Sequence, residues 1–333
     1  MGTLKFLLVT WLKRSSKTAQ KVGGFTLLEL LVGLVLAFLI ITPLLGFVIN
    51  IMNTDRQEQA KSNSEQEIQS AMEYISRDLQ QAVYIYDQYA LDNPHSNDPT
   101  TSGIQGELPQ VPNGEPVLVF WKRKFVADAV SVAGDPNQKN DAFIYSLVAY
   151  YLITPSTATS SWSGTARIGR FEIHDELIDP ETGDVIVEKV PGFKSFTLSQ
   201  GGTIAQSMNQ WEKSGENYDL SQLNILIDYI DQTPTTVDAD PVPFEACPPD
   251  SNPPPGDGDS EWTQVPSNSP TYSFYACVWS AKNTARVYMR GNALARINSI
   301  NNLPTYNAGQ ASFFPKARIE VKSRAGLGAT SGS

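Results

Sequence analysis

Cysteine and histidine are scarce in this sequence, which has two of each among 333 residues. A zinc site built from paired cysteines needs more of them, so we expect none. Neither His95 nor His174 lies in a nucleophile motif, and a glycine-rich phosphate loop is missing from the sequence. His174, Asp175 and Glu176 form either a base or metal cluster or, on an exposed strand face, a plain group of charges. We therefore expect that the protein is not an enzyme, that it needs no cofactor and that it has no metal site of this kind.

Basic residues are outnumbered, with 25 Lys and Arg against 35 Asp and Glu and a net charge of −10. Nonspecific binding to nucleic acid is therefore not expected. Residues 281–324 reverse this balance, with one acid, Glu320, and eight basic residues: Lys282, Arg286, Arg290, Arg296, Lys316, Arg318, Lys322 and Arg324. These residues either pair with acidic strands of the same domain or stay solvated, or they form a patch for an acidic neighbouring subunit or an anionic polysaccharide.

Charge is absent from residues 30–49, where Thr42 is the only polar side chain. As an α-helix, this run spans about 30 Å, the thickness of a bilayer's hydrocarbon core. Residues 1–24 contain no acid and five basic residues, Lys5, Lys13, Arg14, Lys17 and Lys21, which predicts a cytoplasmic N-terminus. A secretory signal would be shorter and end at a small-residue cleavage site, which residues 53–58 do not offer. We expect a retained, single-pass transmembrane helix over residues 25–52.

One carboxylate, Glu29, lies just inside the leading edge of this apolar run. A charge near the bilayer centre costs about 3 kcal/mol on insertion scales, so Glu29 either reaches back to the interface or has a function. The segment Gly24-Phe-Thr-Leu-Leu-Glu-Leu, behind its short basic leader, resembles the processing site of type IV pilins and type II secretion pseudopilins. The combination of leader, Gly-Phe junction, glutamate and apolar helix carries this resemblance.

The resemblance implies roles for three residues. In that family a membrane-embedded prepilin peptidase cuts after the glycine, here Gly24, and N-methylates the new first residue, here Phe25. Residues 1–24 would then be a cleaved cytoplasmic leader. Glu29 would serve filament assembly by pairing with the ammonium terminus of a neighbouring subunit, since an opposite charge removes much of the cost of a carboxylate in hydrocarbon. The family's helix can also melt near Pro43 in a filament, although a tolerated membrane proline explains this residue equally well.

An apolar stripe indicates that the helix continues beyond the membrane over residues 53–86. Its members recur at three- and four-residue steps: Ile68, Met72, Ile75, Leu79, Ala82 or Val83, and Tyr86. The stripe is expected to pack on a β-sheet of the same chain, with a coiled-coil partner as the alternative. Residues 53–67 lack the stripe, which suits a solvated bridge. The whole helix would contain about 60 residues, as in a pilin stalk.

The rest of the chain predicts a β-rich head over residues 87–324 and a flexible tail over 325–333. A polar loop is expected at 87–114, followed by strands at 115–126, 141–153, 166–178, 184–190, 193–198, 222–230, 285–290 and 317–322. Residues 179–184 predict a hairpin turn with Gly183 at positive φ. The expected fold class is α+β and type IV pilin-like, a long N-terminal transmembrane helix packed on an antiparallel β-sheet head.

Cys247 and Cys277 flank a proline-rich loop. Outside the cytoplasm we expect them to form a disulfide, with two buried thiols or a metal pair as alternatives. Three alternating acids of this loop resemble the start of a calcium loop: Asp257, Asp259 and Glu261. However, Trp262 and Asn268 stand where an EF-hand has glycine and glutamate, so a solvated loop is the competing interpretation.

The resemblance extends to the larger minor pseudopilins of type II secretion systems and type IV pili over residues 25–87. Four segments look closest to cyanobacterial pseudopilins tied to hormogonium polysaccharide secretion and gliding motility: 55–61, 65–71, 77–87 and 287–294. The implied function is a structural subunit of an inner-membrane filament that exports polysaccharide or protein. Its implied partners are the prepilin peptidase, other pseudopilins and an inner-membrane assembly platform. The alternative function is a glycan-binding adhesive head displayed on a pilus.

Overall fold

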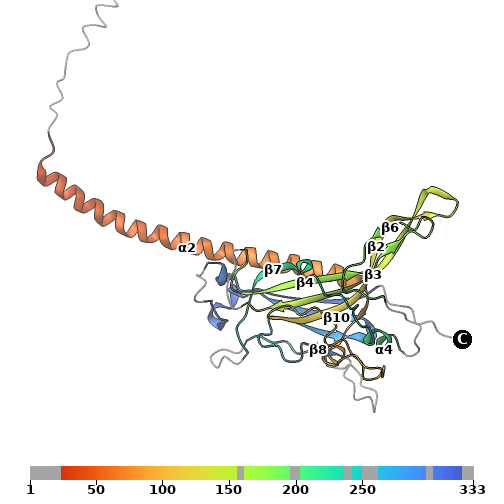
Figure 1. Ribbon diagram of the computed structural model, residues 1–333. Helices are drawn as coiled ribbons and strands as arrows, with labels where there is room; N and C mark the ends of the chain where they lie inside the picture. Colours follow the sequence, from red (N-terminus) through yellow and green to blue (C-terminus); the bar gives the residue numbers. More distant parts are fainter. Residues whose placement is uncertain are drawn as a thin grey trace, which may run out of the picture. The chain divides into compact units, whose positions relative to one another are not determined.

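The computed structural model describes residues 24–155, 161–195, 203–235, 242–249, 262–297 and 303–324, without the side chains of 135–137. The chain divides into two compact units, Met1–Asp55 and Arg56–Ser333. The predicted long helix is α2, Leu27–Gln80, which begins in the first unit and ends in the second (Figure 1). The leader and the C-terminal tail lie outside the described residues, apart from Gly24.

Within the first unit, residues 30–49 of α2 are apolar on all sides, and every described residue of the unit is exposed. Among the described residues it is the one helix long and apolar enough to cross a membrane. Such a helix is suited to lipid, because an apolar surface all round is not stable in water. Pro43 lies inside the helix, which continues past it, and the adjacent Thr42 Oγ1 donates a hydrogen bond of 2.8 Å to the Phe38 carbonyl oxygen.

In the second unit, α2 buries one stripe against the β-sheets. The stripe comprises Ala60, Ser64, Ile68, Ala71, Met72, Ile75, Ser76, Asp78 and Leu79. The expectation that residues 53–67 lack a buried stripe is therefore wrong, because Ala60 and Ser64 extend it toward the N-terminus. Side chains as small as those of Ala60 and Ser64 add little to a hydrophobic pattern in the sequence. They can still be buried, because they let other groups approach the helix closely.

The helix ends at Gln80, and the prediction that it continues to residue 86 is also wrong. Strand β1, Ala82–Ile85, follows and pairs antiparallel with β2, with Tyr84 opposite Trp121 and Ile85 opposite Phe120. All four residues of β1 are buried, so the strand shows no alternation of polar and apolar residues. Its apolar residues happen to continue the helical spacing, which explains the error.

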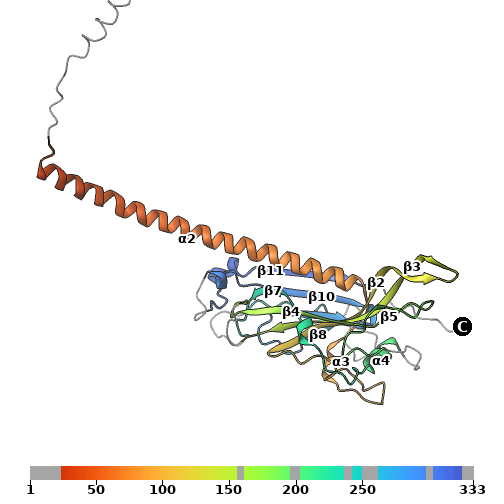
Figure 2. The same cartoon turned by 45° about the horizontal axis from the view of Figure 1, so that its top comes forward.

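The first sheet has the order β1-β2-β3-β4-β7, and all neighbouring strands in it are antiparallel. Figure 2 shows β2, β3, β4 and β7 of this sheet. Its further strands are β2 Gly114–Val132, β3 Asp135–Ile153, β4 Ala166–His174 and β7 Asn224–Ile230. The strand predicted at 166–178 is interrupted after His174, and β5 Leu177–Ile178 pairs with β6 Val185–Val187 instead. Gly183 has φ +75°, which confirms the predicted hairpin turn. Residues 193–195 form no strand, and 196–198 lie outside the described residues.

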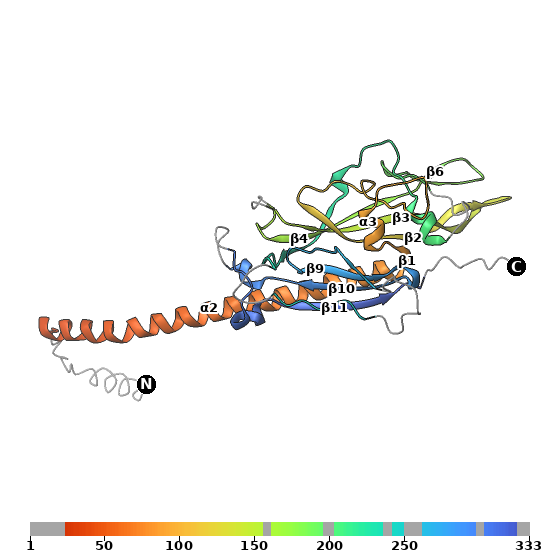
Figure 3. The same ribbon diagram turned by 90° about the horizontal axis from the view of Figure 1, so that it is seen from below.

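The second sheet has the order β11-β10-β9-β8 and lies along α2 (Figure 3). Its strands are β8 Thr263–Val265, β9 Phe274–Trp279, β10 Thr284–Arg290 and β11 Lys316–Lys322. Strands β10 and β11 confirm the two predicted near the C-terminus, whereas β8 and β9 were missed. The shorter helices are α3 Gln88–Asp92 and α4 Ile204–Asn209, with 3₁₀ turns at Leu220–Gln222, Ser280–Lys282, Ala293–Arg296 and Ala308–Phe313.

Two hydrophobic cores lie on opposite faces of the first sheet. The first core joins Ile75 of α2 with Phe120 of β2 and Val287 of β10. The second core joins Trp121, the next residue of β2, with Trp211 from the loops that cover the outer face. Both faces of the central part of the sheet are therefore buried, which explains the continuous apolar runs at 117–121 and 147–153 in the sequence. The described part of the chain is an α+β protein with antiparallel sheets.

We predict that Ile75→Ala lowers the free energy of unfolding of the second unit by about 3 kcal/mol, because Ile75 is fully buried and the residual cavity adds to the lost burial. Urea titration of the full chain in detergent, followed by tryptophan fluorescence, measures this loss. Glu73→Ala on the exposed face of the same helix is the matched control. Its pair with Arg77 is worth less than about 1 kcal/mol. Equal losses in the two variants would contradict the packing described.

Candidate functional site

Gly24, Phe25 and Thr26 form an exposed, non-helical segment directly before α2. Thr26 is the N-cap of the helix, since its Oγ1 accepts a hydrogen bond of 3.3 Å from the Glu29 backbone N–H. In return, the Thr26 N–H donates to Glu29 Oε2 at 3.1 Å, which completes a reciprocal capping box. The Phe25 side chain is 84% exposed. The Gly24–Phe25 bond thus has the exposed, irregular backbone that proteases cut.

The capping box gives Glu29 a local partner that the sequence analysis missed, although Thr-x-x-Glu before an apolar run is a recognised signal. Glu29 Oε2 also accepts a hydrogen bond from Thr26 Oγ1 at 3.1 Å. A negative charge in the first turn is further favoured by the helix dipole. Glu29 therefore stabilises the start of its own helix, whatever else it contacts. A glutamine could make the same capping bond without the charge.

Asp78, near the other end of α2, is the centre of a buried ion-pair cluster. Its Oδ1 lies 3.0 Å from Lys122 Nζ on β2, and its Oδ2 lies 2.7 Å from Arg170 Nε on β4. The Tyr150 hydroxyl of β3 also donates to Oδ2 at 2.7 Å. Glu172 contacts the same two cations, with Lys122 Nζ at 3.2 Å and Arg170 Nη2 at 2.7 Å. One helical carboxylate thereby fixes α2 against three adjacent strands.

The charges of this cluster compensate one another away from water. Burial alone would raise the pKa of Asp78, but Arg170 and Lys122 lower it below its ordinary value. The pKa of Glu172 is lowered in the same way, against the same effect of burial. An acid near a helix C-terminus also opposes the helix dipole, so Asp78 depends on these cations for its stabilising effect.

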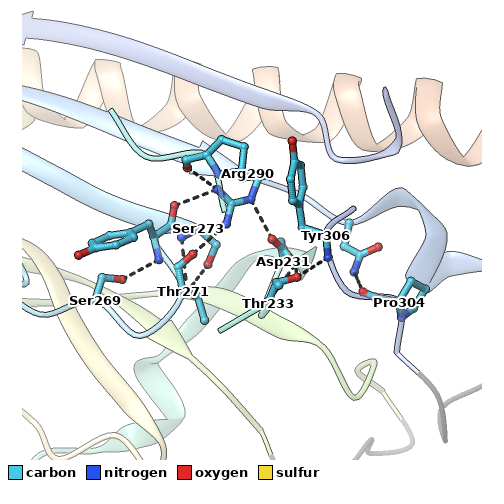
Figure 4. Close-up of polar contacts among 11 residues, drawn as sticks. Asp231, Thr233, Ser269, Thr271, Ser273, Arg290, Pro304 and Tyr306 are labelled. Carbon is cyan, nitrogen blue, oxygen red and sulfur yellow. Dashed lines mark hydrogen bonds and ion pairs between the residues drawn. The ribbon is translucent and has the colours of Figure 1, made fainter. Parts of the chain in front are cut away.

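A second buried cluster connects the two sheets through Arg290 of β10 (Figure 4). Arg290 Nε lies 2.8 Å from Asp231 Oδ2, just beyond β7, and both side chains are nearly inaccessible. The other guanidinium nitrogens donate to the carbonyl oxygens of Pro243 and Thr271 at 2.8 Å each. Asp231 Oδ1 accepts from the Thr233 hydroxyl at 2.7 Å. These hydrogen bonds offset the cost of burying the charges of Arg290 and Asp231 in the interior.

The basic residues of the C-terminal stretch are largely paired within the second unit. Four of the eight form ion pairs, Arg286 with Glu320, Arg290 with Asp231, Arg296 with Glu67 and Arg318 with Glu245. A fifth, Lys282, places its ammonium 3.4 Å from the centre of the Trp279 ring. Of the alternatives raised by the sequence, the structure therefore favours internal pairing over a free basic patch.

The remaining candidate residues have structural surroundings. Cys247 and Cys277 form a disulfide with an S–S distance of 1.99 Å, which ties the segment 242–249 to β9. His95 Nε2 lies 3.2 Å from Glu212 Oε1. Lys189 Nζ lies 4.0 Å from Asp175 Oδ1 and 3.7 Å from Glu176 Oε1. Among the described residues, no group of three or more His, Cys, Asp and Glu could hold a metal ion. The calcium candidates Asp257, Asp259 and Glu261 lie outside the described residues.

The candidate residues fall into separate places along the chain. Gly24, Phe25 and Glu29 are brought together at the start of α2, in the first unit, whereas the buried ion pairs lie in the second. Comparison with protein-family models, curated proteins and solved structures gave no match to this chain. The helix start is therefore the candidate functional site, on the basis of its residues and geometry.

We predict that Asp78→Asn lowers the free energy of unfolding at pH 7 by about 3 kcal/mol, because it leaves buried cations undercompensated. Both carboxyl pKa values are depressed in the folded state, so their stabilisation is present above the ordinary carboxyl pKa of about 4 and is lost as the pH falls through the folded values. The stability gap between Asp78→Asn and the unmodified protein should therefore narrow toward pH 3.

Urea unfolding of the full chain in detergent, at a series of pH values between 3 and 7, measures this gap. The exposed residue Asp184, on the β5–β6 turn, provides the control variant Asp184→Asn, which should leave stability unchanged at every pH. A gap that stays constant across the series would contradict the assigned role of the Asp78 charge.

Proposed function

We propose that this protein is a minor pseudopilin-like subunit of a type IV pilus or type II secretion-like filament. The helix α2 anchors it in the cytoplasmic membrane, with the N-terminus in the cytoplasm and the second unit outside. The basic residues before the apolar run support this orientation. The protein acts structurally, as part of a filament that exports polysaccharide or protein and contributes to gliding motility, and not as an enzyme.

One observation carries the proposal. A Gly24–Phe25 bond lies in an exposed segment immediately before the capped start of an exposed apolar helix, and Glu29 lies in the first turn of that helix. Each part has a use in a processed filament subunit. A prepilin peptidase cuts the Gly24–Phe25 bond, and the apolar helix stays in the membrane. The Glu29 carboxylate is the negative charge that pairs with the ammonium terminus of a neighbouring subunit.

In the proposed mechanism, cleavage after Gly24 creates an ammonium group on Phe25, which is then N-methylated and remains cationic. Glu29 of one subunit pairs with the Phe25 ammonium of another at the edge of the hydrocarbon layer. Because an uncompensated carboxylate is costly there, the pairing favours one axial register between neighbouring helices. Other pseudopilins and an inner-membrane assembly platform are the proposed partners.

The alternative, an adhesive head that binds an anionic glycan through its basic residues, has weaker support. Its key residues Arg286 and Arg318 already contact Glu320 and Glu245 of the same chain. A glycan carboxylate at that place would have to displace an existing partner. We therefore do not propose an anion-binding site at the C-terminal basic cluster.

We predict that Gly24→Ala blocks removal of the leader, while the unmodified protein from native membranes begins at N-methylated Phe25. Intact-mass and N-terminal analysis measures both. A Cβ at Gly24 would meet no atom within 4 Å, so a block would reflect recognition by the peptidase and not misfolding. Gly33→Ala is the matched control, since a Cβ at this apolar helix position also meets nothing within 4 Å. Normal maturation of Gly24→Ala would rule out the proposed cleavage site.

We predict that Glu29→Gln is cleaved normally but enters filaments at least about tenfold less efficiently, because glutamine retains the capping bond and lacks the charge. Glu29→Ala loses both functions and should be at least as defective. The fraction of subunit recovered in sheared or cross-linked filaments measures the effect. Full incorporation of Glu29→Gln together with failure of Glu29→Ala would assign the residue to helix capping alone.

A further inference from the structure

A groove of about 1150 Å³ lies within the second unit, between the exposed side of α2 and the edge strand β7. Ten of its twenty lining residues bear an amide, hydroxyl or carboxylate group. The residues that carry the argument are Asn63, Gln66 and Tyr74 from α2, Trp162 from the loop before β4, and Asp228 and Tyr229 from β7. The groove is separate from the candidate processing site at the start of α2.

Aromatic rings line both walls of this groove. Tyr74 on α2 and Trp162 on the opposite loop are each 40% exposed. Tyr229 adds a third ring, held by the Arg296 guanidinium 4.2 Å from its centre. The Arg170 guanidinium likewise lies 5.5 Å from the centre of the Tyr74 ring, on one of its faces. Aromatic side chains in a polar groove suit ligands that present flat C–H surfaces together with polar edges.

The polar groups of the groove suit a ligand rich in hydroxyl groups. Side-chain amides such as Asn63 and Gln66 both donate and accept hydrogen bonds, as hydroxyls do. The two carboxylates of the groove already have partners. Glu67 pairs with Arg296, and Asp228 accepts from the Ser163 backbone N–H at 2.8 Å and its hydroxyl at 2.7 Å. The two lining cations are also paired, Arg77 with Glu73 at 3.8 Å and Arg296 with Glu67. Because these charges are balanced within the chain, the groove favours a neutral polar ligand over a strongly charged one.

The edge strand is unsuited to pairing with an added peptide strand. Its pairing with β4 shifts register twice, between Ala166 and Ile168 and between Ile168 and Gly169. Tyr229 has φ +60°, a left-handed conformation that is strained for a non-glycine residue. Such irregularities block strand addition and redirect side chains, and they concentrate at binding sites. The polar helix wall likewise lacks the apolar anchor positions that a partner helix needs.

We infer that this groove binds a sugar chain. The rings of Tyr74 and Trp162 lie against the C–H faces of sugar residues, while Asn63 and Gln66 bond to their hydroxyl groups. The biological role of this binding rests on the proposed function, because a polysaccharide is one cargo of the proposed filament. Binding itself requires neither cleavage nor filament assembly, so the two proposals fail separately.

The test uses the full chain in lipid nanodiscs, titrated with maltohexaose, cellohexaose, a mannan hexasaccharide and oligogalacturonate, and with a strand-forming peptide for comparison. Tryptophan fluorescence and calorimetry measure binding. We expect saturable binding of at least one neutral oligosaccharide, and Trp162→Ala and Tyr74→Ala should each weaken it by about tenfold. Tyr74→Phe keeps the ring and should retain binding. Tyr89→Ala is the matched control, because Tyr89 is 47% exposed and does not line the groove.

The inference is overturned if none of the neutral oligosaccharides binds, if the Trp162 and Tyr74 variants bind as tightly as the unmodified protein, or if the peptide binds in the groove instead. Unchanged urea unfolding of each variant excludes loss of binding through loss of fold. Failure of sugar binding with a normal Phe25 terminus would remove this inference alone. Conversely, sugar binding with a different mature N-terminus would remove the proposed processing and leave the groove assignment intact.

Discussion

The contact of Asp78 with Arg170 and Lys122 is the interaction on which the second unit depends. The apolar stripe of α2 buries area but would tolerate small rotations of the helix, whereas a carboxylate held by two cations and Tyr150 permits one orientation. The cost of burying these charges is large, so the cluster stabilises the fold only when all its members are in place. We interpret it as the element that fixes the helix against β2, β3 and β4.

The ion pair of Arg290 and Asp231 fixes the second sheet against the first, at the place where β10 meets the end of β7. Backbone bonds join the sheets beside them, from the Asp231 N–H to the Arg290 carbonyl oxygen and from the Asn292 N–H to the Tyr229 carbonyl oxygen. One group of buried charges thus lies where α2 meets the first sheet and the other where the two sheets meet, while the core around them is apolar. Hydrophobic burial is not directional, so directional polar contacts at the junctions define how the layers meet.

The sequence predicted the features that depend on local pattern. These include the start of α2, strands β10 and β11, and the positive φ of Gly183. It failed where burial on both faces removes periodicity, as in β1, and where small residues such as Ala60 form the contact. The partners of Asp78 are 44 to 92 residues away, so no local signal could identify them. The Thr26–Glu29 capping box was local and was overlooked.

The capping contact of Glu29, together with its proposed pairing with a neighbouring subunit, implies an order of events under the proposed function. Before cleavage, the carboxylate caps its own helix, and such a cap is worth about 1 kcal/mol. A carboxylate drawn farther into hydrocarbon without a countercharge loses about 3 kcal/mol, so capping alone does not compensate for burial in the membrane core. In the proposed function, the cleavage step provides that countercharge as the Phe25 ammonium. An unprocessed chain therefore keeps Glu29 at the helix start, and only a processed neighbour offers a partner strong enough to compete for it.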